Sequence, residues 1–341
     1  MVTETLFIAH TPYHILLSLG MAEKGDHLVI LADFNETEIF NKLIKKHYQS
    51  IFSTIQILPG RMTVNNVLWR RVLLSRKNKK HIHRFYESGT IERTVIFNDS
   101  AVEGQYAAYL SYKRGIPSVY TEDGLVAYVP PVDPPRNALK DFLAKVLFGG
   151  FYQNGILMGT SKWITGAQLL FPAMAIPDLV IKNPRGLDKN IFNKIPNDFI
   201  LDFTEGVDND LDVIVVLPHS DVLSSISNDS PCIGGVNRDK FESIIRDLEG
   251  HYSKVGVKYH PRETKFFLGD NPDFKMLPNH VPMELIYLKQ RTGNVKLVVS
   301  ALSTAAYTAR FILGDRVTIK AVGVGDNMVQ QLFEDQNIGI L

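Results

Sequence analysis

Two adjacent carboxylates, Glu122 and Asp123, precede Gly124 and follow the short β-prone run 118–121. The glycine permits an unusual turn, which would hold both carboxylates at the mouth of a cleft. Burial of one carboxylate beside another can raise its pKa enough to make it a general base. Asp-Gly is also a common turn dipeptide. The pair therefore predicts a base, with a solvated turn as the alternative.

A lysine and a histidine close a second β-prone run, 255–259. Lys258 and His260 are two residues apart and so lie on the same side of a strand, and Pro261 ends the ladder. The two suit a phosphate leaving group, because the histidine can donate a proton while the lysine offsets negative charge. The alternative is a histidine that is hydrogen-bonded in an ordinary turn.

Small hydroxyl residues follow a third β-prone run, 295–299. Ser300, Ser303 and Thr304 start a helical pattern, and the N-terminus of a helix offers free N–H groups to an anion. Glu284, two residues after Pro282, can accept hydrogen bonds from sugar hydroxyls. Plain N-capping and a first-turn glutamate favoured by the helix dipole are the alternatives.

The elements that must position these residues are short apolar β-prone runs that alternate with helical patterns, which is typical of parallel α/β units. The expected strands are 6–10, 27–32, 94–97, 118–121, 212–217, 255–259, 295–299 and 316–322, with 156–158 and 179–181 as further candidates. The expected helices include 13–23, 36–48, 101–113 and 239–249. Ligands of doubly wound folds bind beyond the carboxyl ends of strands, where most of the candidates lie.

The chain is long enough for two domains of about 150 residues. A stretch rich in Pro, Asn, Asp and Gly, 186–211, predicts a linker between a domain at 1–185 and a second at 212–325. The final segment is 326–341. We therefore expect an α/β protein with two doubly wound, Rossmann-like parallel-sheet domains.

Taken in order, the acidic pair and the Lys-x-His-Pro, Pro-x-Glu and Ser-Thr motifs resemble the bacterial sialyltransferases of the GT-B type. Those families share an Asp/Glu-Asp/Glu-Gly motif, a His-Pro motif and a Ser-Ser/Thr motif. The sequence from His10 to Leu16 looks like the Thr-Pro turn that opens lipooligosaccharide sialyltransferases and capsule polysialyltransferases. The resemblance covers about residues 6–310. It implies a GT-B fold, with the two domains facing across a cleft and 326–341 crossing back to the first domain.

The resemblance also implies roles. Asp123, or Glu122 in its place, removes the proton of the acceptor hydroxyl, and His260 acts as acid for the departing CMP phosphate. The implied donor-binding residues are Lys258, Pro261, Glu284, Ser300, Ser303 and Thr304, with His219 and Ser220 in the loop after 212–217. The expected acceptor-binding residues are Thr11, Pro12, His14, Asn98 and Asp99, with the region 130–136. The reaction would be one inverting displacement without metal, because protein groups can neutralise the single phosphate of CMP.

The expected function is transfer of sialic acid from CMP-sialic acid to a terminal sugar of a lipooligosaccharide or capsule. The motifs do not reach the donor sugar, so three alternatives stay open. They are another donor on the same scaffold (CMP-Kdo or a UDP-hexose), elongation of a polysialic acid chain, and a non-catalytic glycan-binding protein.

Composition excludes other classes. The 37 basic and 36 acidic residues give no global basic excess of the kind a nucleic-acid binder shows. Glycine motifs of dinucleotide dehydrogenases and NTPases are missing from the sequence. Asp208-Asn209-Asp210 resembles the Asp-x-Asp of metal-dependent glycosyltransferases, but it precedes a strand instead of ending one. We therefore expect no metal and no other cofactor, and a nucleotide sugar and a glycan as partners.

A single cysteine, Cys232, and the lack of a long apolar run favour the cytoplasm. The basic run 76–84 is expected to be a solvated face, with an anionic acceptor or anionic lipid as alternatives. The apolar segment 142–151 is expected to be core, with a shallow membrane-facing surface as the alternative. Peripheral contact with the inner membrane stays open for these two segments.

Overall fold

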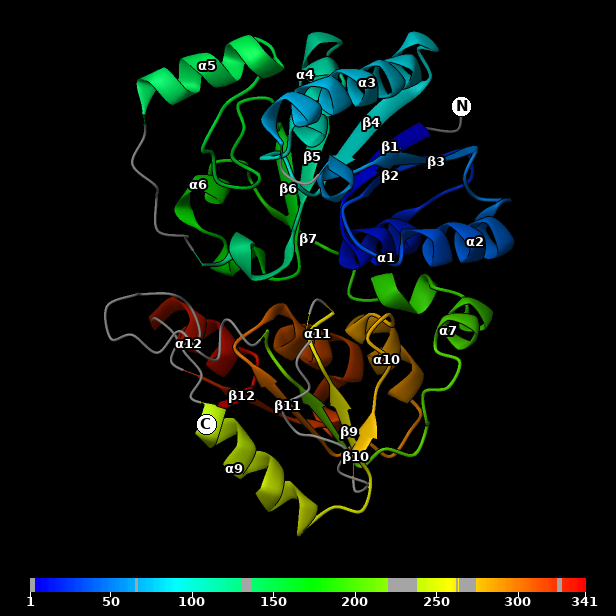
Figure 1. The fold of residues 1–341 in the computed structure, drawn as a ribbon, viewed down its shortest axis with the longest axis vertical. Helices are drawn as coiled ribbons and strands as arrows, with labels where there is room; N and C mark the ends of the chain where they lie inside the picture. Colours follow the sequence, from blue (N-terminus) through cyan, green and yellow to red (C-terminus); the bar gives the residue numbers. More distant parts are fainter. Residues whose placement is uncertain are drawn as a thin grey trace. The chain divides into compact units, whose positions relative to one another are not determined.

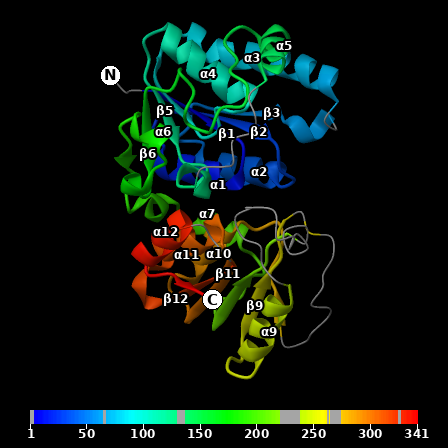
Figure 2. The ribbon, with the colours of Figure 1, turned by 90° about the vertical axis from the view of Figure 1, so that its left-hand side faces the viewer.

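The computed structural model describes residues 4–64, 67–129, 137–219, 238–261, 263, 274–323 and 327–341. The chain divides into two compact units, Met1–Phe199 and Ile200–Leu341. Each unit is a parallel sheet with helices on both faces, as predicted (Figures 1 and 2). The boundary between the units falls inside the stretch expected to be a linker, although part of that stretch is helical.

The first unit is built on a seven-stranded parallel sheet with the order β3-β2-β1-β4-β5-β6-β7. Its strands are β1 (Glu4–Ala9), β2 (His27–Ala32), β3 (Thr54–Pro59), β4 (Ile91–Ile96), β5 (Ser118–Thr121), β6 (Gly166–Leu169) and β7 (Arg185–Gly186). The chain winds outward from β1 on one side and from β4 on the other. The carboxyl ends of β1 and β4 are therefore the switch point, where ligands of open α/β sheets bind.

Helices cover both faces of this sheet. The bounds are α1 (Pro12–Met21), α2 (Thr37–Tyr48), α3 (Leu68–Glu87), α4 (Val102–Lys113), α5 (Ala138–Phe148) and α6 (Pro177–Val180), with short 3-10 turns at η1 (Arg61–Val64), η2 (Gly124–Ala127), η3 (Pro172–Met174) and η4 (Ile191–Lys194). Helices α1 and α2 lie on one face, and α3 and α4 lie on the other (Figures 1 and 2). Helix α5 packs beside α3 and not on the sheet.

Several elements of the first unit differ from the prediction. Residues 156–158 form no strand and 179–181 end a short helix, while the sheet is completed by three strands that were not predicted, β3, β6 and β7. Strand β6 has the sequence Gly-Ala-Gln-Leu, which lacks the β-branched residues that mark a strand. The buried stripe of α3 includes Ser75 and Asn78, so its apolar periodicity is interrupted. The lack of β-branched residues in β6 and the inward-facing polar side chains of α3 explain why the sequence pattern did not indicate these elements.

The second unit has a six-stranded parallel sheet with the order β10-β9-β8-β11-β12-β13. Its strands are β8 (Val213–Val216), β9 (Val255–Lys258), β10 (Phe274–Met276), β11 (Leu297–Ala301), β12 (Thr318–Val322) and β13 (Gly339–Ile340). Its helices are α7 (Asn197–Phe203), α9 (Arg238–Glu249), α10 (Met283–Gln290), α11 (Thr304–Leu313) and α12 (Asn327–Asp335), with the 3-10 turn η5 (Gly314–Arg316). Helix α7 begins in the first unit. On one face, Phe241, Ile245 and Leu248 of α9 pack on the strands. Their spacing is one apolar stripe of a helix.

The C-terminal segment belongs to the second unit, which corrects the expectation that it crosses back. Gly339 and Ile340 of β13 pair with Lys320 and Ala321 of β12. Ile338, just before the strand, is buried. These contacts add a sixth strand at the edge of the second sheet, so the end of the chain contributes to that sheet. Among the described residues, no helix is long and apolar enough to cross a membrane.

Close packing of the loop after β4 against α4 requires Gly104. A Cβ at this position would lie 2.0 Å from the carbonyl oxygen of Asn98. We predict that Gly104→Ala lowers the free energy of unfolding by about 1–3 kcal/mol, despite the better helix propensity of alanine. Urea unfolding followed by circular dichroism measures the effect. Gly150→Ala is the control, because nothing lies within 4 Å of its Cβ position; equal stability of the two variants would contradict the prediction.

Candidate functional site

Asp123 and His14 form a hydrogen-bonded pair at the carboxyl edge of the first sheet. Asp123 follows β5, and Gly124 after it has a φ of 77°, which a residue with a side chain rarely adopts. The Oδ1 atom of Asp123 is 2.6 Å from Nε2 of His14 on the first turn of α1. The His14 side chain is fully buried, whereas 18% of the Asp123 side chain is exposed. Asp123 is therefore the member of the pair that solvent or substrate can reach.

The surroundings of His14 select its tautomer. The backbone N–H of His10 donates to His14 Nδ1 at 3.2 Å, so Nδ1 is the acceptor and Nε2 carries the proton that is donated to Asp123. The ring stacks on Phe97 at a centroid distance of 4.7 Å. Thr11 caps α1 by accepting a hydrogen bond from the His14 N–H, and Pro12 is the first residue of that helix. The predicted acceptor residues Thr11 and Pro12 thus hold His14, and His14 orients the carboxylate.

A second histidine–aspartate pair, His10 and Asp33, lies at the same edge. His10 Nδ1 is 3.4 Å from Asp33 Oδ2, and Arg61 Nε is 3.6 Å from the same oxygen. Burial raises the pKa of Asp33, but the hydrogen bond and charge of His10 and the charge of Arg61 outweigh it and hold the pKa below its usual value. His10 Nε2 is buried and has no hydrogen-bond partner among the residues that the structure describes. Such an atom marks a site that a ligand can complete.

His10 and Asp33 were not predicted as site residues, although the sequence contains a signal for both. His10 follows β1 directly and Asp33 follows β2 directly. The register pairs Ala9 with Ile30, so these two strands end close together. The rule that polar residues just after strands gather at one edge would have found both.

Glu122 has a structural role, unlike its neighbour. Its side chain is fully buried and accepts hydrogen bonds from the Tyr13 hydroxyl at 2.9 Å, from the Leu170 N–H at 2.7 Å, and from the Tyr128 hydroxyl. These bonds join α1, β5 and β6 beneath the edge. Of the two carboxylates, Asp123 is the one with the exposure that a base requires.

Asn98 and Asp99 shape the loop after β4. The Asn98 side chain accepts from the backbone N–H groups of Ser100 and Ala101, at 3.1 and 3.0 Å. Asp99 is fully buried and accepts from the N–H groups of Gly159 at 2.6 Å and Ser161 at 2.9 Å. The structure therefore gives Asp99 a structural role in place of the predicted acceptor contact. Residues 130–136, the other predicted acceptor region, lie outside the described residues.

A small pocket of the first unit contains two arginines. Arg61 of η1 and Arg71 of α3 line it together with Ser100 and Tyr152. Arg61 also contacts Asp33, so the pocket adjoins the histidine–aspartate edge. The carboxylate of Glu103 also lines the pocket, so the two guanidinium groups outnumber it and, with the serine and the tyrosine, suit an anionic group such as a carboxylate or phosphate.

In the second unit, the structure brings together the two predicted histidines. His219 follows β8 and His260 follows β9, and these strands are neighbours in the sheet. Their rings lie 5.4 Å apart, edge to face. Pro261 comes next in the turn after β9, while Ser220 lies outside the described residues.

The predicted hydroxyl residues occupy the same carboxyl edge. Strand β11 pairs with β8 and extends to Ala301, so Ser300 is a strand residue. Ser303 is the N-cap of α11, with its hydroxyl 3.0 Å from that of Ser300, and Thr304 is the first residue of the helix. An anion at this edge would meet the positive end of a ten-residue helix as well as the histidines.

Lys258 and Glu284 lie beneath this edge. Lys258 is buried, and its ammonium group donates to the carbonyl of Asn279 at 2.9 Å. Burial raises the pKa of Glu284, while a hydrogen bond from Thr308 and the charge of Lys258 act in the opposite direction. Lys258 therefore supports the loop that contains Asn279, Glu284 interacts with Thr308 of α11, and direct contact of either with a nucleotide stays a prediction.

The Asp-x-Asp sequence is engaged in ion pairs. Asp208 pairs with Lys275, and Asp210 pairs with Lys254. Within the described ranges, no three His, Cys, Asp or Glu side chains are grouped as a metal ion would require. Independence of metal stays a prediction.

Comparison with known proteins assigns the fold class. No protein-family model and no curated protein matches the chain by sequence. By structure, the chain is similar to a putative UDP-N-acetylglucosamine 2-epimerase from Listeria monocytogenes, with a TM-score of 0.57 and 12% identity over 99% of this chain and 84% of that one. It is also similar to Arabidopsis thaliana UGT89C1 complexed with UDP-L-rhamnose, with a TM-score of 0.54 and 10% identity over 100% of this chain and 85% of that one. The chain has a GT-B fold, as predicted.

The buried carboxyl group of Asp99 should make the stability of the protein depend on pH. Burial raises its pKa to about 6, against offsetting hydrogen bonds from Gly159 and Ser161. The folded state then binds a proton more tightly than the unfolded state, so Asp99 makes stability fall as the pH rises from about 4 to 6, by about 2–3 kcal/mol at most. Asp99→Asn removes this contribution, so its stability should change less with pH over that interval.

Urea unfolding at several pH values measures the slopes. Asp178→Asn, which changes an exposed aspartate of the same unit, is the control and should follow the native protein. Parallel stability curves for Asp99→Asn and the native protein would refute the assignment.

Proposed function

We propose that the chain is a glycosyltransferase that moves a sugar from a nucleotide donor to an acceptor hydroxyl, with Asp123 as the base. The observation that carries the proposal is the pair of Asp123 and His14, in which a partly exposed carboxylate is fixed by a buried histidine of defined tautomer. The GT-B fold supports the same reaction class.

The proposed reaction assigns the acceptor proton and the leaving phosphate to different residues. Asp123 accepts the proton of the acceptor hydroxyl as that oxygen bonds to the anomeric carbon of the donor sugar, and His14 keeps the carboxylate oriented through its Nε2–H. The bond from the anomeric carbon to the donor phosphate breaks, and the phosphate leaves with negative charge. His260, with His219 beside it, and the N-terminus of α11 at Ser303 stabilise that charge. A single displacement of this kind inverts the anomeric centre.

A UDP-hexose is the first donor candidate. Arabidopsis thaliana UGT89C1, which shares the fold, is complexed with UDP-L-rhamnose. CMP-sialic acid, with a lipooligosaccharide or capsule glycan as acceptor, is the second donor candidate and rests on the order of the sequence motifs. The arginine pocket of the first unit favours an acceptor that carries an anionic group.

A UDP-sugar epimerase is the second candidate function, since the Listeria monocytogenes protein is named as a putative UDP-N-acetylglucosamine 2-epimerase. An epimerase changes UDP-N-acetylglucosamine without any acceptor, whereas a transferase needs one. Proton NMR of UDP-N-acetylglucosamine with the protein alone distinguishes them: appearance of a second UDP-sugar isomer would replace the transferase proposal.

Calorimetric titration with UDP, CMP and CDP in the presence of EDTA tests the donor site. Binding of UDP above CMP supports a UDP-sugar donor, and binding of CMP alone supports CMP-sialic acid. His260→Ala and Ser303→Ala should each weaken the preferred nucleotide about tenfold, because each removes a hydrogen bond to a charged phosphate. His251→Ala, an exposed histidine at the opposite end of β9, should bind as the native protein does. Absence of binding by all three nucleotides would overturn the proposal.

Asp123→Asn should lower kcat by about 10²–10⁴-fold and leave nucleotide affinity unchanged, because the amide keeps the shape but cannot take a proton. Release of nucleotide from the donor identified by titration is the assay. His14→Leu should also lower kcat, because the carboxylate loses the Nε2–H donor that orients it. Unchanged kcat in Asp123→Asn, with Asp178→Asn as control, would remove Asp123 from the mechanism.

A further inference from the structure

Helix α5 turns its apolar face outward. Leu139, Phe142, Leu143 and Val146 have the spacing of one helical stripe, and their exposed fractions are 66%, 63%, 49% and 62%. Such a stripe is ordinarily the side of a helix that packs on the core. Phe148 is the buried residue of this helix. The expectation that the apolar segment 142–151 is core is therefore wrong for α5, although Phe151 is buried.

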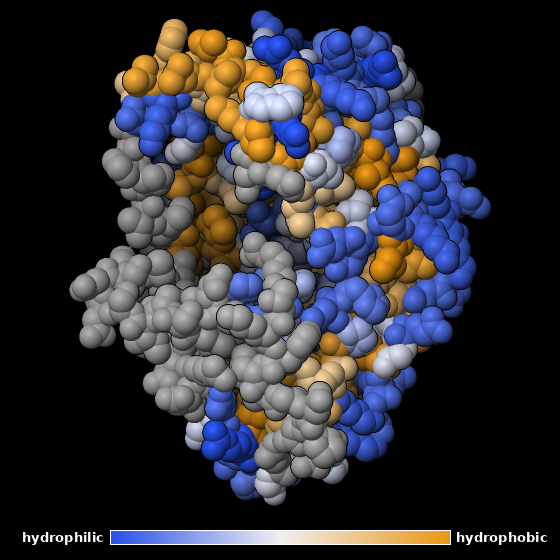
Figure 3. Space-filling view, in the orientation of Figure 1, coloured by the Kyte–Doolittle hydropathy of each residue, from blue (hydrophilic) through white to orange (hydrophobic). Residues whose placement is uncertain are grey.

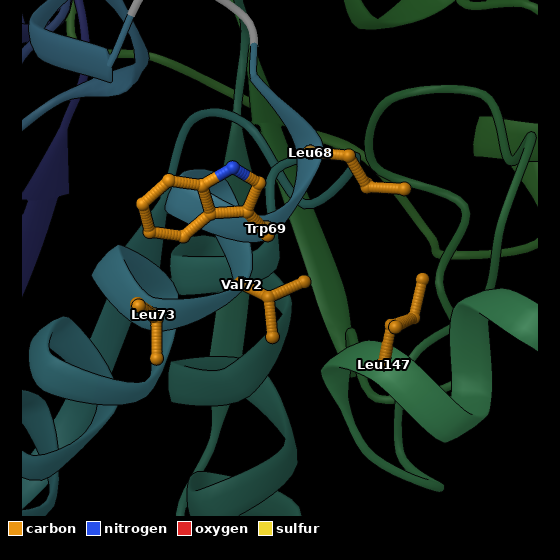
Figure 4. A pocket seen from close by; sticks show the side chains of 5 residues that line it. All are labelled: Leu68, Trp69, Val72, Leu73 and Leu147. Carbon is orange, nitrogen blue, oxygen red and sulfur yellow. The ribbon is translucent and has the colours of Figure 1, made fainter.

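The start of α3 extends this apolar surface. Leu68, Trp69 and Leu73 are more than half exposed. Together with Val72 of the same helix and Leu147 of α5 they line a shallow pocket (Figure 4). The space-filling view shows apolar side chains gathered over α5 and the neighbouring part of α3 (Figure 3). An exposed apolar area formed by two helices is larger than the scattered apolar residues of ordinary surfaces, and it marks an interaction site.

Positive charge accompanies the apolar surface. Helices α3 and α5 together contain nine basic and two acidic residues, whereas the whole chain has 37 basic and 36 acidic residues. Exposed basic residues on these helices include Arg70, Arg76, Lys77, Lys80, Lys140 and Lys145. The remainder of the chain is net acidic, so the basic residues are concentrated on the helices that carry the apolar surface.

We propose that α3 and α5 form a docking surface for a membrane that contains anionic phospholipids. The apolar stripe of α5 and the side chains of Leu68, Trp69 and Leu73 would enter the boundary between headgroups and acyl chains, while the basic residues bind lipid phosphates. The guanidinium group of Arg70 lies 5.2 Å from the ring centre of Trp69. A tryptophan paired with an arginine in this way suits the headgroup level of a membrane.

The geometry favours lying on the membrane over crossing it. Helix α5 has 11 residues and is about 16 Å long, far short of the roughly 20 residues that span a bilayer. A second copy of the chain is a poorer occupant, because pairing through this face would bring two basic helices of like charge together. The inference depends on the surface alone and is independent of the reaction proposed above.

Co-sedimentation of the full chain with vesicles tests the surface. We expect binding to phosphatidylcholine vesicles that contain about one third phosphatidylglycerol, and binding about tenfold weaker or less without the anionic lipid or at about 0.5 M salt. Phe142→Glu with Val146→Glu should weaken binding at least about tenfold, because each places a charge in the apolar boundary. Both positions are exposed, so circular dichroism should show a folded variant.

Two controls separate this surface from general stickiness. Val180→Glu with Ile181→Glu changes two exposed apolar residues outside the surface and should leave binding unchanged. Lys77→Glu with Lys80→Glu should weaken binding to anionic vesicles, whereas Lys42→Glu with Lys45→Glu on α2 should not.

Three results would overturn the proposal. The first is no binding to anionic vesicles, and the second is equal loss in the control variants. The third is a native protein that does not bind vesicles but forms a dimer in sedimentation velocity, and whose dimer dissociates in the variant with Phe142→Glu and Val146→Glu. That result would identify a second copy of the chain as the occupant of the surface.

Discussion

The hydrogen bond between His14 and Asp123 is the interaction on which the first unit's site depends. Its partners are 109 residues apart, on α1 and after β5, with β4 between their strands in the sheet. Each partner is also fixed by contacts close to it in the sequence. Thr11 caps the helix that carries His14, while the Asp123 N–H donates to the Tyr120 hydroxyl and Gly124 turns the chain away. The parallel sheet brings His14 and Asp123 within hydrogen-bond distance, because the carboxyl ends of its strands lie at one edge.

Burial of so many polar groups beside one another is tolerated because their hydrogen bonds are made. Glu122 accepts from two tyrosines and a backbone N–H, and Asp99 accepts from two backbone N–H groups. A buried carboxylate without such partners would be strongly destabilising. These two acids hold the loops after β4 and β5 in place. The rigid surroundings leave Asp123 as a carboxylate with a defined position and a solvent-exposed side, which is the arrangement a base requires.

The sequence predicted the structure well where a single strand is followed directly by a polar residue. The strands 27–32 and 118–121 have the predicted bounds, and the meeting of His219 with His260 follows from two neighbouring strands that end alike. It was less informative where burial decides the role. Asp99 and Asp123 are both aspartates just after strands, yet one is enclosed by the loop at 159–161 and the other is not. That enclosure is a tertiary contact over about 60 residues, and local spacing does not encode it.

Periodicity has the same limit for helices. The stripe of Leu139, Phe142, Leu143 and Val146 has the pattern of a buried face, and the basic run 76–84 has the pattern of a solvated one. In the structure, α3 turns Ser75 and Asn78 inward, where Asn78 donates to the Pro59 carbonyl and to Glu103, while α5 turns its leucines outward. A period identifies which residues share a face, but the burial of that face depends on what the rest of the fold places against it. Helices α3 and α4 already cover that face of the sheet, so the apolar stripe of α5 has no part of the sheet to pack against and stays exposed.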